Sequence, residues 1–299
     1  MSKNVLVSGA SGFIGTHVTK LLADHGYNVI MLSRSARGSR KNVVRWSPTE
    51  GEIDTNGLTD LNAVVHLAGE SIAGRWTADK KSRIENSRVL GTKLLSETLA
   101  NLSKKPEVLI SASAVGIYGD RESELLDESS EPGEGFLADV AVKWEEATSP
   151  AKKAGIRVCN LRIGLVLGND GGALEKMLLP FKFGVGGKIG DGKQYWSWIA
   201  IDDLESIIFY LIENKSIEGP INAVAPNPVT NSEFTSELGK TLNRPTLIPL
   251  PAFAAKGLLG EMAEETMLSS TKVMPKKLLD AGFEFKYTDL KKALSGILN

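Results

Sequence analysis

The sequence lacks several features that would assign it to a specialised class of protein. It has one cysteine in 299 residues, Cys159, which lies in an apolar run; a disulfide framework is therefore excluded, and we expect a buried strand thiol and a reducing compartment. Its three histidines, His17, His25 and His66, share no metal-ligand spacing, and no cysteine stands near them. We therefore predict no metal site.

Long apolar runs and an excess of charge of either sign are also absent. No stretch of about 18 apolar residues is present, and the amino terminus breaks into glycines too early for a signal peptide, so we expect a cytoplasmic protein without a membrane span. The 35 basic and 36 acidic residues leave a formal net charge of -1, which gives no general attraction to nucleic acid or to an anionic membrane. The expected partner is a small-molecule substrate, and we expect a monomer or a homodimer.

What the sequence does contain is a regular alternation of short β-branched runs with amphipathic stretches. The predicted strands span residues 4–8, 27–32, 62–68, 107–113 and 155–163, and the predicted helices span residues 13–25, 80–102 and 137–154. The strands are almost continuously apolar, which is typical of parallel strands buried on both faces. We therefore predict an α/β fold: a Rossmann-type, doubly wound parallel sheet with a smaller, mostly helical C-terminal lobe.

The sequence pattern changes after residue 165. A glycine-rich stretch, FGVGGKIGDGK, is followed by an aromatic segment and a helical pattern, and from residue 226 prolines punctuate mostly helical segments. We predict that residues 1–165 and about 196–225 form the Rossmann-type domain, and that about 166–195 and 226–299 form the smaller lobe.

The stretch VLVSGASGFIGTHV joins the first predicted strand to the first predicted helix. Its glycines, Gly9, Gly12 and Gly15, lack a Cβ where a backbone must turn tightly and approach a dinucleotide's pyrophosphate. The N–H groups at the helix start, at Phe13 and Ile14, would face that anion. The glycine spacing gains weight from its place in the first strand–turn–helix unit, and the alternative is that the glycines only permit a tight turn.

A chain that binds NAD usually places an acidic residue at the end of the second strand, where it binds the ribose 2′-hydroxyl. This sequence has Ser33 and Arg34 there, followed by a stretch without any acid. The basic residues of this stretch are Arg34, Arg37, Arg40, Lys41 and Arg45. Because guanidinium groups bind phosphate in a bidentate manner, the pattern favours the 2′-phosphate of NADP over NAD, with a solvated basic loop as the alternative.

The motifs GASGFIG, VVHLAGES, SRVLGT, SASAVGIYG and LRIGLVLG, in this order, resemble those of the extended short-chain dehydrogenase/reductases, which include sugar-nucleotide epimerases and dehydratases. A narrower resemblance, to the subgroup called simply the epimerase family, rests on KWEEA, WSWIAIDDL, NAVAPNPVTNSEF and PLPAFAAKGLLGE. It covers nearly the whole chain. It implies a fold and a nicotinamide cofactor, and it does not specify a reaction.

The resemblance also implies roles for individual residues. Leu67, Ala68 and Gly69 would lie along the ribose and pyrophosphate of the cofactor, and Leu165 would present its backbone to the nicotinamide. Arg88 stands where the larger family carries an asparagine, three residues before Gly-Thr. An arginine there suits oxygens of the cofactor or the substrate, and a structural ion pair is the alternative.

Enzymes of this class use a serine or threonine, a tyrosine and, four residues after the tyrosine, a lysine. The resemblance implies that Ser113 is the serine, but GFLADVAVKWEEA offers no tyrosine. If Lys143 is the lysine, Asp139 occupies the place of the tyrosine; in a second register, Leu137 and Ala141 occupy the two places. Neither register restores the pair, so a proton donor has to come from elsewhere if the protein is an enzyme.

Tyr118 is the alternative proton donor, because in the resembling enzymes it ends the serine loop and faces the same cavity. An unperturbed phenol has a pKa of about 10 and would need a cation nearby, for which Lys143 and Arg88 are the candidates; the alternative role of Tyr118 is packing. Further residues expected to line the substrate pocket, or else to pack the lobes together, are Glu70, Trp76, Arg83, Tyr195, Trp196 and Trp198.

Three functions are compatible with these residues. The first is an NADP(H)-dependent oxidoreductase of the extended short-chain type, in which Ser113 polarises a carbonyl and Tyr118 or water supplies the proton. The second is a sugar-nucleotide epimerase or dehydratase, which the family name suggests but which the missing tyrosine and the Ser33–Arg34 pair disfavour. The third is a sensor or assembly protein that binds NADP(H) without turnover.

Overall fold

The computed structural model describes residues 3–34 and 42–298 and has an eight-stranded sheet at its centre. The strand order is β12-β8-β6-β5-β1-β2-β3-β4, and every neighbouring pair is parallel except β3 and β4. The strands are β1 Asn4–Ser8, β2 Asn28–Ser33, β3 Val43–Ser47, β4 Glu52–Ile53, β5 Leu61–His66, β6 Val108–Ala114, β8 Arg157–Ile163 and β12 Gly219–Ala223. This arrangement confirms the predicted parallel α/β sheet.

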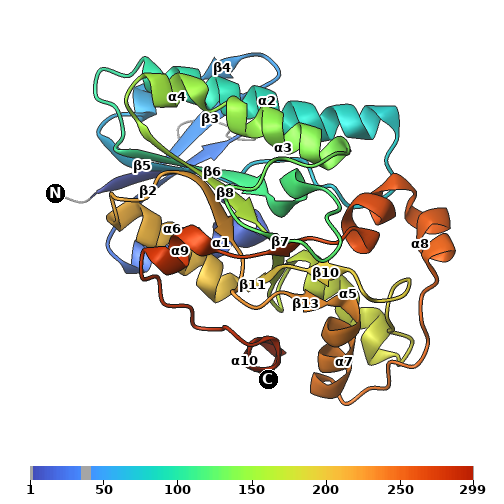
Figure 1. Cartoon of the computed structure of the whole chain (residues 1–299). Coiled ribbons are helices and arrows are strands. Elements are labelled where there is room, and N and C mark those ends of the chain that lie inside the picture. The colour runs from blue at the N-terminus through green and yellow to red at the C-terminus, as the bar shows by residue number, and fades with distance from the viewer. Residues whose placement is uncertain (1–2, 35–41, 299) are drawn as a thin grey trace.

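Helices cover both faces of the sheet (Figure 1). One layer contains α2 Ala78–Ala100, α3 Phe136–Glu146 and α4 Ser149–Lys153, and the other contains α1 Phe13–Asp24, α6 Ile201–Glu213 and α9 Lys276–Asp280. Val5 and Val7 belong to the apolar core on the α1–α6 side, whereas Leu6 belongs to the core on the α2–α4 side. Successive residues of a strand point to opposite faces, so β1 has to be apolar at every position between two such cores.

The order of the strands reverses at β1. From β1 the chain continues to β2 and β3 on one side, and then returns to β5, β6 and β8 on the other side. The helix after β1 and the helix after β5 lie on opposite faces of the sheet (Figure 1). Ligands of open α/β sheets bind at the carboxyl ends of the strands that flank such a reversal. The carboxyl ends of β1, β5 and β6 are therefore the place to look for a site.

The smaller lobe is mostly helical, as predicted, and has its own apolar core. The elements outside the sheet are β7 Leu125–Leu126, β9 Leu165–Leu167, β10 Tyr195–Trp196, β11 Trp198–Ala200, β13 Val229–Thr230, β14 Lys272–Val273, α5 Gly172–Lys182, α7 Asn231–Thr241, α8 Ala252–Leu259, α10 Leu290–Leu298, the 3₁₀ helices η1 Thr55–Gly57 and η2 Val115–Tyr118, and the π-helix η3 Ala263–Leu268. Trp198, Phe234 and Leu294 are buried at the centre of this core. A capping box between Thr230 and Glu233 starts α7.

Two strands and one helix differ from the pattern expected from the sequence. The edge strand β12 begins with Gly219 and Pro220, and proline is tolerated there because an edge strand does not need every N–H for pairing. The strand β3 carries an exposed arginine, Arg45, in its middle. The helix expected over 137–154 is divided into α3 and α4, because Pro150 starts a new helix and cannot donate to the preceding one.

Candidate functional site

The turn between β1 and α1 contains three glycines that differ in the space around them. Gly9 has a φ of +70°, and a Cβ there would lie 2.8 Å from the carbonyl carbon of Leu67. A Cβ on Gly15 would lie 2.1 Å from the carbonyl oxygen of Gly9. A Cβ on Gly12 would meet, among the described residues, only that same oxygen, at 3.3 Å. Packing therefore requires Gly9 and Gly15, whereas Gly12 has a side that is open to a ligand.

Gly12 is also the N-cap of α1, and it leaves the start of the helix without a capping side chain. The first turn contains no acidic residue either. A Cβ on Gly168 or Gly171 would collide with the ring of Phe13, so this ring anchors α1 to the loop after β9. The first N–H groups of a helix lack intrahelical acceptors and carry the positive end of the helix dipole. The backbone at Phe13 and Ile14 is thus suited to a phosphate group.

A buried polar network fixes the end of β5 against the end of β1. The Ser8 hydroxyl oxygen accepts hydrogen bonds from the N–H groups of Leu67, at 3.1 Å, and Ala68, at 3.2 Å, and lies 2.6 Å from Nδ1 of His66. Nε2 of His66 lies 3.0 Å from the Thr92 hydroxyl. Burial lowers the pKa of His66 to about 4, so its ring is neutral at physiological pH. The predicted stretch 67–69 is therefore held by Ser8 and His66, a contact that sequence reasoning did not identify.

Ser33 and Arg34 lie at the end of β2, as their sequence position predicts. Ser33 is the register partner of Arg45 on β3, and Arg34 has an exposed side chain. The residues predicted for the basic patch that lie outside the described residues are Arg37, Arg40 and Lys41. The charge of Arg34 contributes to the lowered pKa of Glu70, which stands just after β5. Arg34 therefore faces the carboxyl edge of the sheet.

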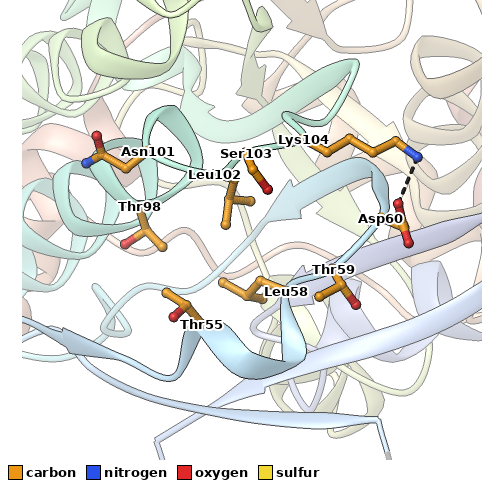
Figure 2. A pocket seen from close by; sticks show the side chains of 9 residues that line it. All are labelled: Thr55, Leu58, Thr59, Asp60, Thr98, Asn101, Leu102, Ser103 and Lys104. Atoms are coloured by element: carbon orange, nitrogen blue, oxygen red, sulfur yellow. Dashed lines mark hydrogen bonds and ion pairs between the residues drawn. The ribbon is translucent and has the colours of Figure 1, made fainter.

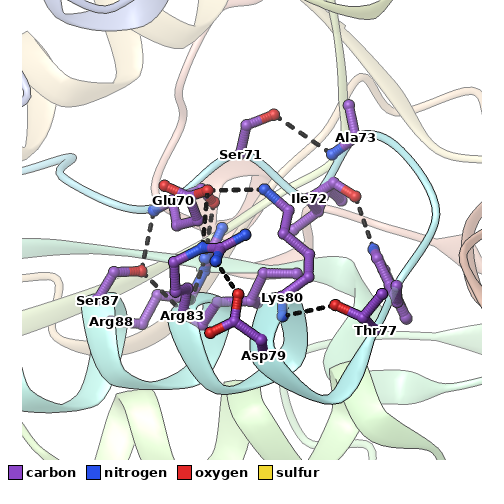
Figure 3. A network of polar contacts seen from close by, with 12 residues as sticks. Glu70, Ser71, Ile72, Ala73, Thr77, Asp79, Lys80, Arg83, Ser87 and Arg88 are labelled. Atoms are coloured by element: carbon purple, nitrogen blue, oxygen red, sulfur yellow. Dashed lines mark hydrogen bonds and ion pairs between the residues drawn. The ribbon is translucent and has the colours of Figure 1, made fainter.

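Glu70 is the centre of a cluster of charged residues at the start of α2 (Figure 3). Its carboxylate accepts a hydrogen bond from Nζ of Lys80, at 2.7 Å, and lies 3.9 Å from Nε of Arg83. The Lys80 hydrogen bond is the largest cause of the lowered pKa of the Glu70 carboxyl. Arg83 also pairs with Asp79, four residues before it on the helix. Glu70 and Arg83, both predicted to line a pocket, are therefore partners in one ion-pair cluster.

Arg88 projects from α2 toward the end of β5 (Figure 3). Its Nη1 donates to the backbone oxygens of Glu70, at 2.9 Å, and Ile84, at 3.1 Å, and its Cζ lies 5.0 Å from the ring centre of Trp144 on α3. A Cβ on Gly69 would lie 3.4 Å from the same Cζ. Burial lowers the pKa of Arg88 to about 10, which leaves it charged at neutral pH. Among the described residues, no carboxylate forms an ion pair with this guanidinium.

Ser113 lies buried near the end of β6, where its hydroxyl meets a buried ion pair. The hydroxyl donates to Oε1 of Glu145 on α3, at 2.7 Å. Nε and Nη2 of Arg162 donate to the two oxygens of Glu145, at 2.8 and 3.0 Å. Arg162 is the register partner of Ser113 on β8, and the side chains of Arg162 and Glu145 are only 8% and 13% exposed. The serine therefore faces a carboxylate that is held in place because Arg162 donates a hydrogen bond to each of its two oxygens.

Glu145 and Arg162 were not identified as site residues by sequence reasoning. The sequence does contain one indication of the pair, which is Arg162 inside the buried strand VCNLRIG. A buried arginine is rare unless an acidic partner neutralises its charge. Glu145 was present in the quoted motif KWEEA, but nothing local distinguishes it from its neighbour Glu146. The pair is visible only once β8 and α3 are placed side by side.

The hydroxyl of Tyr118 is part of the same network, and its ring is fully buried. It accepts a hydrogen bond from Nη1 of Arg162, at 2.9 Å, and lies 2.7 Å from Oδ1 of Asn222 and 3.0 Å from the backbone oxygen of Asp127. Burial raises the pKa of Tyr118, and the charge of Arg162 only partly opposes this effect. The phenol therefore meets protein groups on every side where it can form hydrogen bonds.

The cation beside Tyr118 differs from the two that the sequence suggested. Lys143 is half exposed and pairs with Glu85 on α2, at 2.8 Å. Arg88 contacts the start of α2 and the end of β5. The prediction that Lys143 or Arg88 supplies the charge next to this phenol is therefore wrong, because Arg162 reaches it from the adjacent strand β8.

Leu165 and the aromatic residues predicted near the substrate have mainly packing contacts. The N–H of Leu165 donates to the backbone oxygen of Ser197, at 2.8 Å, and so is already used. Trp76, Trp196 and Trp198 are 9%, 8% and 0% exposed, which leaves them little surface for a ligand. Trp196 and Trp198 belong to the core of the smaller lobe. Trp196 and Trp198 therefore pack the lobe, which is the second of the two roles expected for them.

A cavity of about 610 Å³ lies between η1 and the end of α2 (Figure 2). Its lining residues are Thr55, Leu58, Thr59, Asp60, Thr98, Asn101, Leu102, Ser103 and Lys104. These residues precede β5 and β6, so the cavity is at the amino ends of the strands. Asp60 and Lys104 form an ion pair at one end of it, at 2.8 Å. The cavity is therefore on the opposite edge of the sheet from Ser113 and the glycine turn.

The described residues include no cluster of three His, Cys, Asp or Glu side chains that could hold a metal ion. In the same part of the chain, no helix is both long and apolar enough to cross a membrane. The thiol of Cys159 is buried in β8, and burial raises its pKa to about 11. Cys159 is therefore a protonated core residue at neutral pH.

Known families match both parts of the chain. Residues 5–223 match the NAD dependent epimerase/dehydratase family, and residues 250–297 match a domain of unknown function, DUF1731. Over 292 residues the chain is 39% identical to the epimerase family protein ML0860 of Mycobacterium leprae, an alignment that covers 97% of this chain and 94% of the relative. The similarity thus includes the smaller lobe as well as the sheet.

Two solved structures are similar over almost the whole chain. The crystal structure of human epimerase family protein SDR39U1 (isoform 2) with NADPH has a TM-score of 0.90 and 34% identity, and the match covers 98% of both chains. The nucleoside-diphosphate sugar epimerase from Corynebacterium glutamicum has a TM-score of 0.82 and 39% identity, and the match covers 100% of this chain and 58% of that one. Both similarities extend over the sheet and the smaller lobe.

Proposed function

The chain belongs to the NAD dependent epimerase/dehydratase family, and on this premise we propose that it is an NADP(H)-dependent oxidoreductase that acts on a small molecule at Ser113. The observation that carries the proposal is the Ser113–Glu145 pair near the carboxyl end of β6. This strand neighbours β5, whose end touches the glycine turn after β1. A dinucleotide that lies across β1 and β5 then ends beside Ser113.

The proposed cofactor site begins at the glycine turn. The diphosphate would lie against the open side of Gly12 and the uncapped start of α1. Choice of NADP(H) is supported by Arg34 in the place of an acid, and by the human relative, which was crystallised with NADPH. The further residues proposed to contact the cofactor are Gly9, Phe13, Ile14, Gly15, Ser33, Leu67, Ala68, Gly69, Arg88 and Leu165.

The proposed reaction needs a hydride and a proton, which take separate routes. NADP(H), when bound, would supply or accept the hydride at the substrate carbon. In the oxidation direction, the substrate hydroxyl would donate its proton to Oγ of Ser113 while the Ser113 proton passes to the Glu145 carboxylate; in the reduction direction the same two transfers run in reverse. Arg162 stays charged, because its contacts with Glu145 and Tyr118 raise its pKa despite burial, and it holds the Glu145 carboxylate in position.

Tyr118 has a different role in this proposal from the one that the sequence suggests. Its ring is fully buried, and its hydroxyl contacts Arg162, Asn222 and the backbone of Asp127. A phenol enclosed in this way and carrying a raised pKa is poorly placed to donate a proton to a ligand. We assign it to positioning: Tyr118 holds Arg162, and Arg162 holds the carboxylate behind Ser113.

A nucleotide-sugar epimerase is the second candidate, favoured by the 39% identity to the protein from Corynebacterium glutamicum. An epimerase removes a hydride and returns it to the same molecule, so it needs the same cofactor site and the same serine. The absence of a tyrosine on α3 applies to it equally. The two candidates differ in the fate of the cofactor: a reductase converts NADPH to NADP⁺, whereas an epimerase starts from NADP⁺ and regenerates it in every turnover.

The test is a turnover assay of the parent protein with NADPH and a panel of aldehydes, ketones and quinones, run beside a second assay with NADP⁺ and UDP-glucose in which epimerised product is detected by a coupled reaction. Ser113→Ala is expected to lower NADPH consumption roughly 10²- to 10⁴-fold, the usual value of a positioned proton-transfer group. Ser111→Ala is the matched control, since Ser111 is a buried serine two residues earlier on the same strand and its hydroxyl donates to the backbone oxygen of Ala112.

Each outcome supports or contradicts a specific part of the proposal. NADPH consumption that Ser113→Ala abolishes and Ser111→Ala preserves supports the oxidoreductase. Epimerised sugar without net formation of NADPH supports the second candidate. Full activity of Ser113→Ala would remove this residue from the reaction. Tight NADPH binding without turnover of any compound would favour a sensor.

A further inference from the structure

Arg88 is a cation whose partners account for only part of its hydrogen-bonding capacity. A guanidinium has five N–H groups in a planar fork. Nη1 of Arg88 donates to the backbone oxygens of Glu70 and Ile84, which uses two of them. Among the described residues, no partner is found for Nε or Nη2. These two nitrogens form the edge of the fork that binds a phosphate in a bidentate manner.

The surroundings of Arg88 hold this edge in a fixed direction. The guanidinium stacks on Trp144, with 5.0 Å from Cζ to the ring centre, and two backbone bonds fix its other side. The charge of Glu70 acts on it from beyond ion-pair distance, and burial lowers its pKa. Placing a cation in such a position without a paired carboxylate is unfavourable for the protein alone. The arrangement therefore indicates that the anion next to Arg88 belongs to a bound ligand and is not a carboxylate of the protein.

The topology indicates which anion this is. Arg34 follows β2, on one side of β1, and Arg88 lies against Gly69 at the end of β5, on the other side. A dinucleotide that crosses β1 at Gly12 with its 2′-phosphate near Arg34 extends its other half over β5. Its diphosphate then passes between the start of α1 and the open edge of Arg88.

The two other cations considered for this site already have carboxylate partners. Arg162 is paired with Glu145, and Lys143 is paired with Glu85 and half exposed. We propose that Arg88 binds the diphosphate of the cofactor on its nicotinamide side and so fixes that half of the molecule beside Ser113. This inference rests on the proposed binding of NADP(H). It means that Arg88 on α2 supplies the cation for the nicotinamide half of the cofactor, because Lys143 on α3 does not.

Three ligands of increasing length test the position of this contact by calorimetry. The ligand 2′,5′-ADP carries the 2′-phosphate and the adenine-side 5′-phosphate, 2′-phospho-ADP-ribose adds the nicotinamide-side phosphate and its ribose, and NADPH adds the nicotinamide. Arg88→Gln is expected to lower the affinity for NADPH and for 2′-phospho-ADP-ribose roughly 10- to 100-fold, the range for a lost charge-assisted pair of hydrogen bonds. Affinity for 2′,5′-ADP is expected to stay within about twofold.

The matched control is Lys93→Gln, which removes a positive charge from the exposed face of the same helix. It is expected to leave all three affinities unchanged. Arg88→Lys serves if the Gln variant fails to fold: it keeps the charge but loses the fork, so it should weaken the two longer ligands and spare 2′,5′-ADP. Equal loss for all three ligands, or no loss for NADPH, overturns the inference.

The result also separates this inference from the proposed function. If the parent protein binds no NADPH, the proposed function fails, and the role of Arg88 fails with it. If the parent binds NADPH and Arg88→Gln binds it equally well, the proposed function stands and only the inference is refuted.

Discussion

Gly12→Val is the substitution that separates cofactor binding from folding most sharply. The backbone at Gly12 has φ −80° and ψ 170°, an extended conformation that valine adopts readily. A Cβ at this position approaches only the Gly9 carbonyl oxygen, at 3.3 Å, among the described residues. The branched side chain would therefore occupy the space in front of α1 without disturbing the turn itself.

The magnitudes follow from these contacts. Loss of two charge-assisted hydrogen bonds between the helix start and a diphosphate is worth about 3–6 kcal/mol, or roughly 10²- to 10⁴-fold in affinity for NADPH. Replacement of glycine by valine at an N-cap lowers the free energy of unfolding by only about 1 kcal/mol. Binding should therefore be lost from a protein that remains folded.

Isothermal titration with NADPH and urea unfolding followed by circular dichroism measure the two effects. Gly15→Ala is the contrasting variant, because its Cβ would lie 2.1 Å from the Gly9 oxygen and the turn would have to move. We expect it to lower the free energy of unfolding by about 1–3 kcal/mol. If Gly12→Val binds NADPH as the parent does, the glycine turn is not the diphosphate site, and the reasoning is refuted.

Three further predictions concern single residues. The parent should bind NADPH more tightly than NADH by roughly 1–3 kcal/mol, and Arg34→Asp should reverse that order in fluorescence titrations; equal parent affinities would contradict the 2′-phosphate role. Tyr118→Phe should lower the free energy of unfolding by about 1–3 kcal/mol and leave NADPH affinity unchanged, because it removes a buried partner of Arg162; a fall in turnover of roughly 10²- to 10⁴-fold would instead restore Tyr118 as proton donor. Folding lowers the pKa of His66 from 6.5 to about 4, so the unfolded chain takes up the proton at a higher pH than the folded protein does. The free energy of unfolding should therefore fall by up to about 3 kcal/mol as the pH falls from 6.5 to 4. Urea unfolding across that range should show a smaller loss for His66→Gln and an unchanged loss for the exposed control His25→Gln.

The parallel strands could be predicted because burial on both faces leaves a continuous apolar run in the sequence. The runs at 4–8, 27–32, 62–68, 107–113 and 155–163 correspond to β1, β2, β5, β6 and β8. The edge strands lack this signature, since one side of each faces solvent or a loop. Pro220 in the edge strand β12 is tolerated for that reason. The strand β3 lies next to the outermost strand β4, and its exposed Arg45 also interrupts the apolar run, so neither β12 nor β3 shows the expected pattern.

The glycine turn could be located from sequence because all of its parts are local. A strand, three glycines and a helix start follow one another within a dozen residues, and the structure has them in that order. The network at Ser113 is different, because its members come from β6, η2, α3 and β8. No spacing rule connects Ser113 with Glu145 or with Arg162, and only the parallel register brings Arg162 beside the serine.

On α3, Lys143 and Glu145 lie on different faces of the helix. Successive residues of an α-helix are about 100° apart, so positions 143 and 145 differ by about 200° and point in nearly opposite directions. Lys143 accordingly meets Glu85 at the surface, while Glu145 meets Ser113 inside. Trp144, between them, stacks on Arg88. A motif aligned on the lysine therefore draws attention away from the residue that reaches the serine.

The buried pair of Glu145 and Arg162 is difficult to explain by stability alone. Moving two charges out of water costs several kcal/mol for each ion, and apolar residues of similar volume often stabilise a core as well or better. Here Tyr118 accepts a hydrogen bond from the arginine and in turn donates to Asn222, so further polar groups are taken out of water. The one member of the network that adjoins the proposed nicotinamide position is Ser113, and its hydroxyl is fixed by Glu145. The buried pair, although costly in desolvation energy, is therefore best explained by its role in orienting the Ser113 hydroxyl.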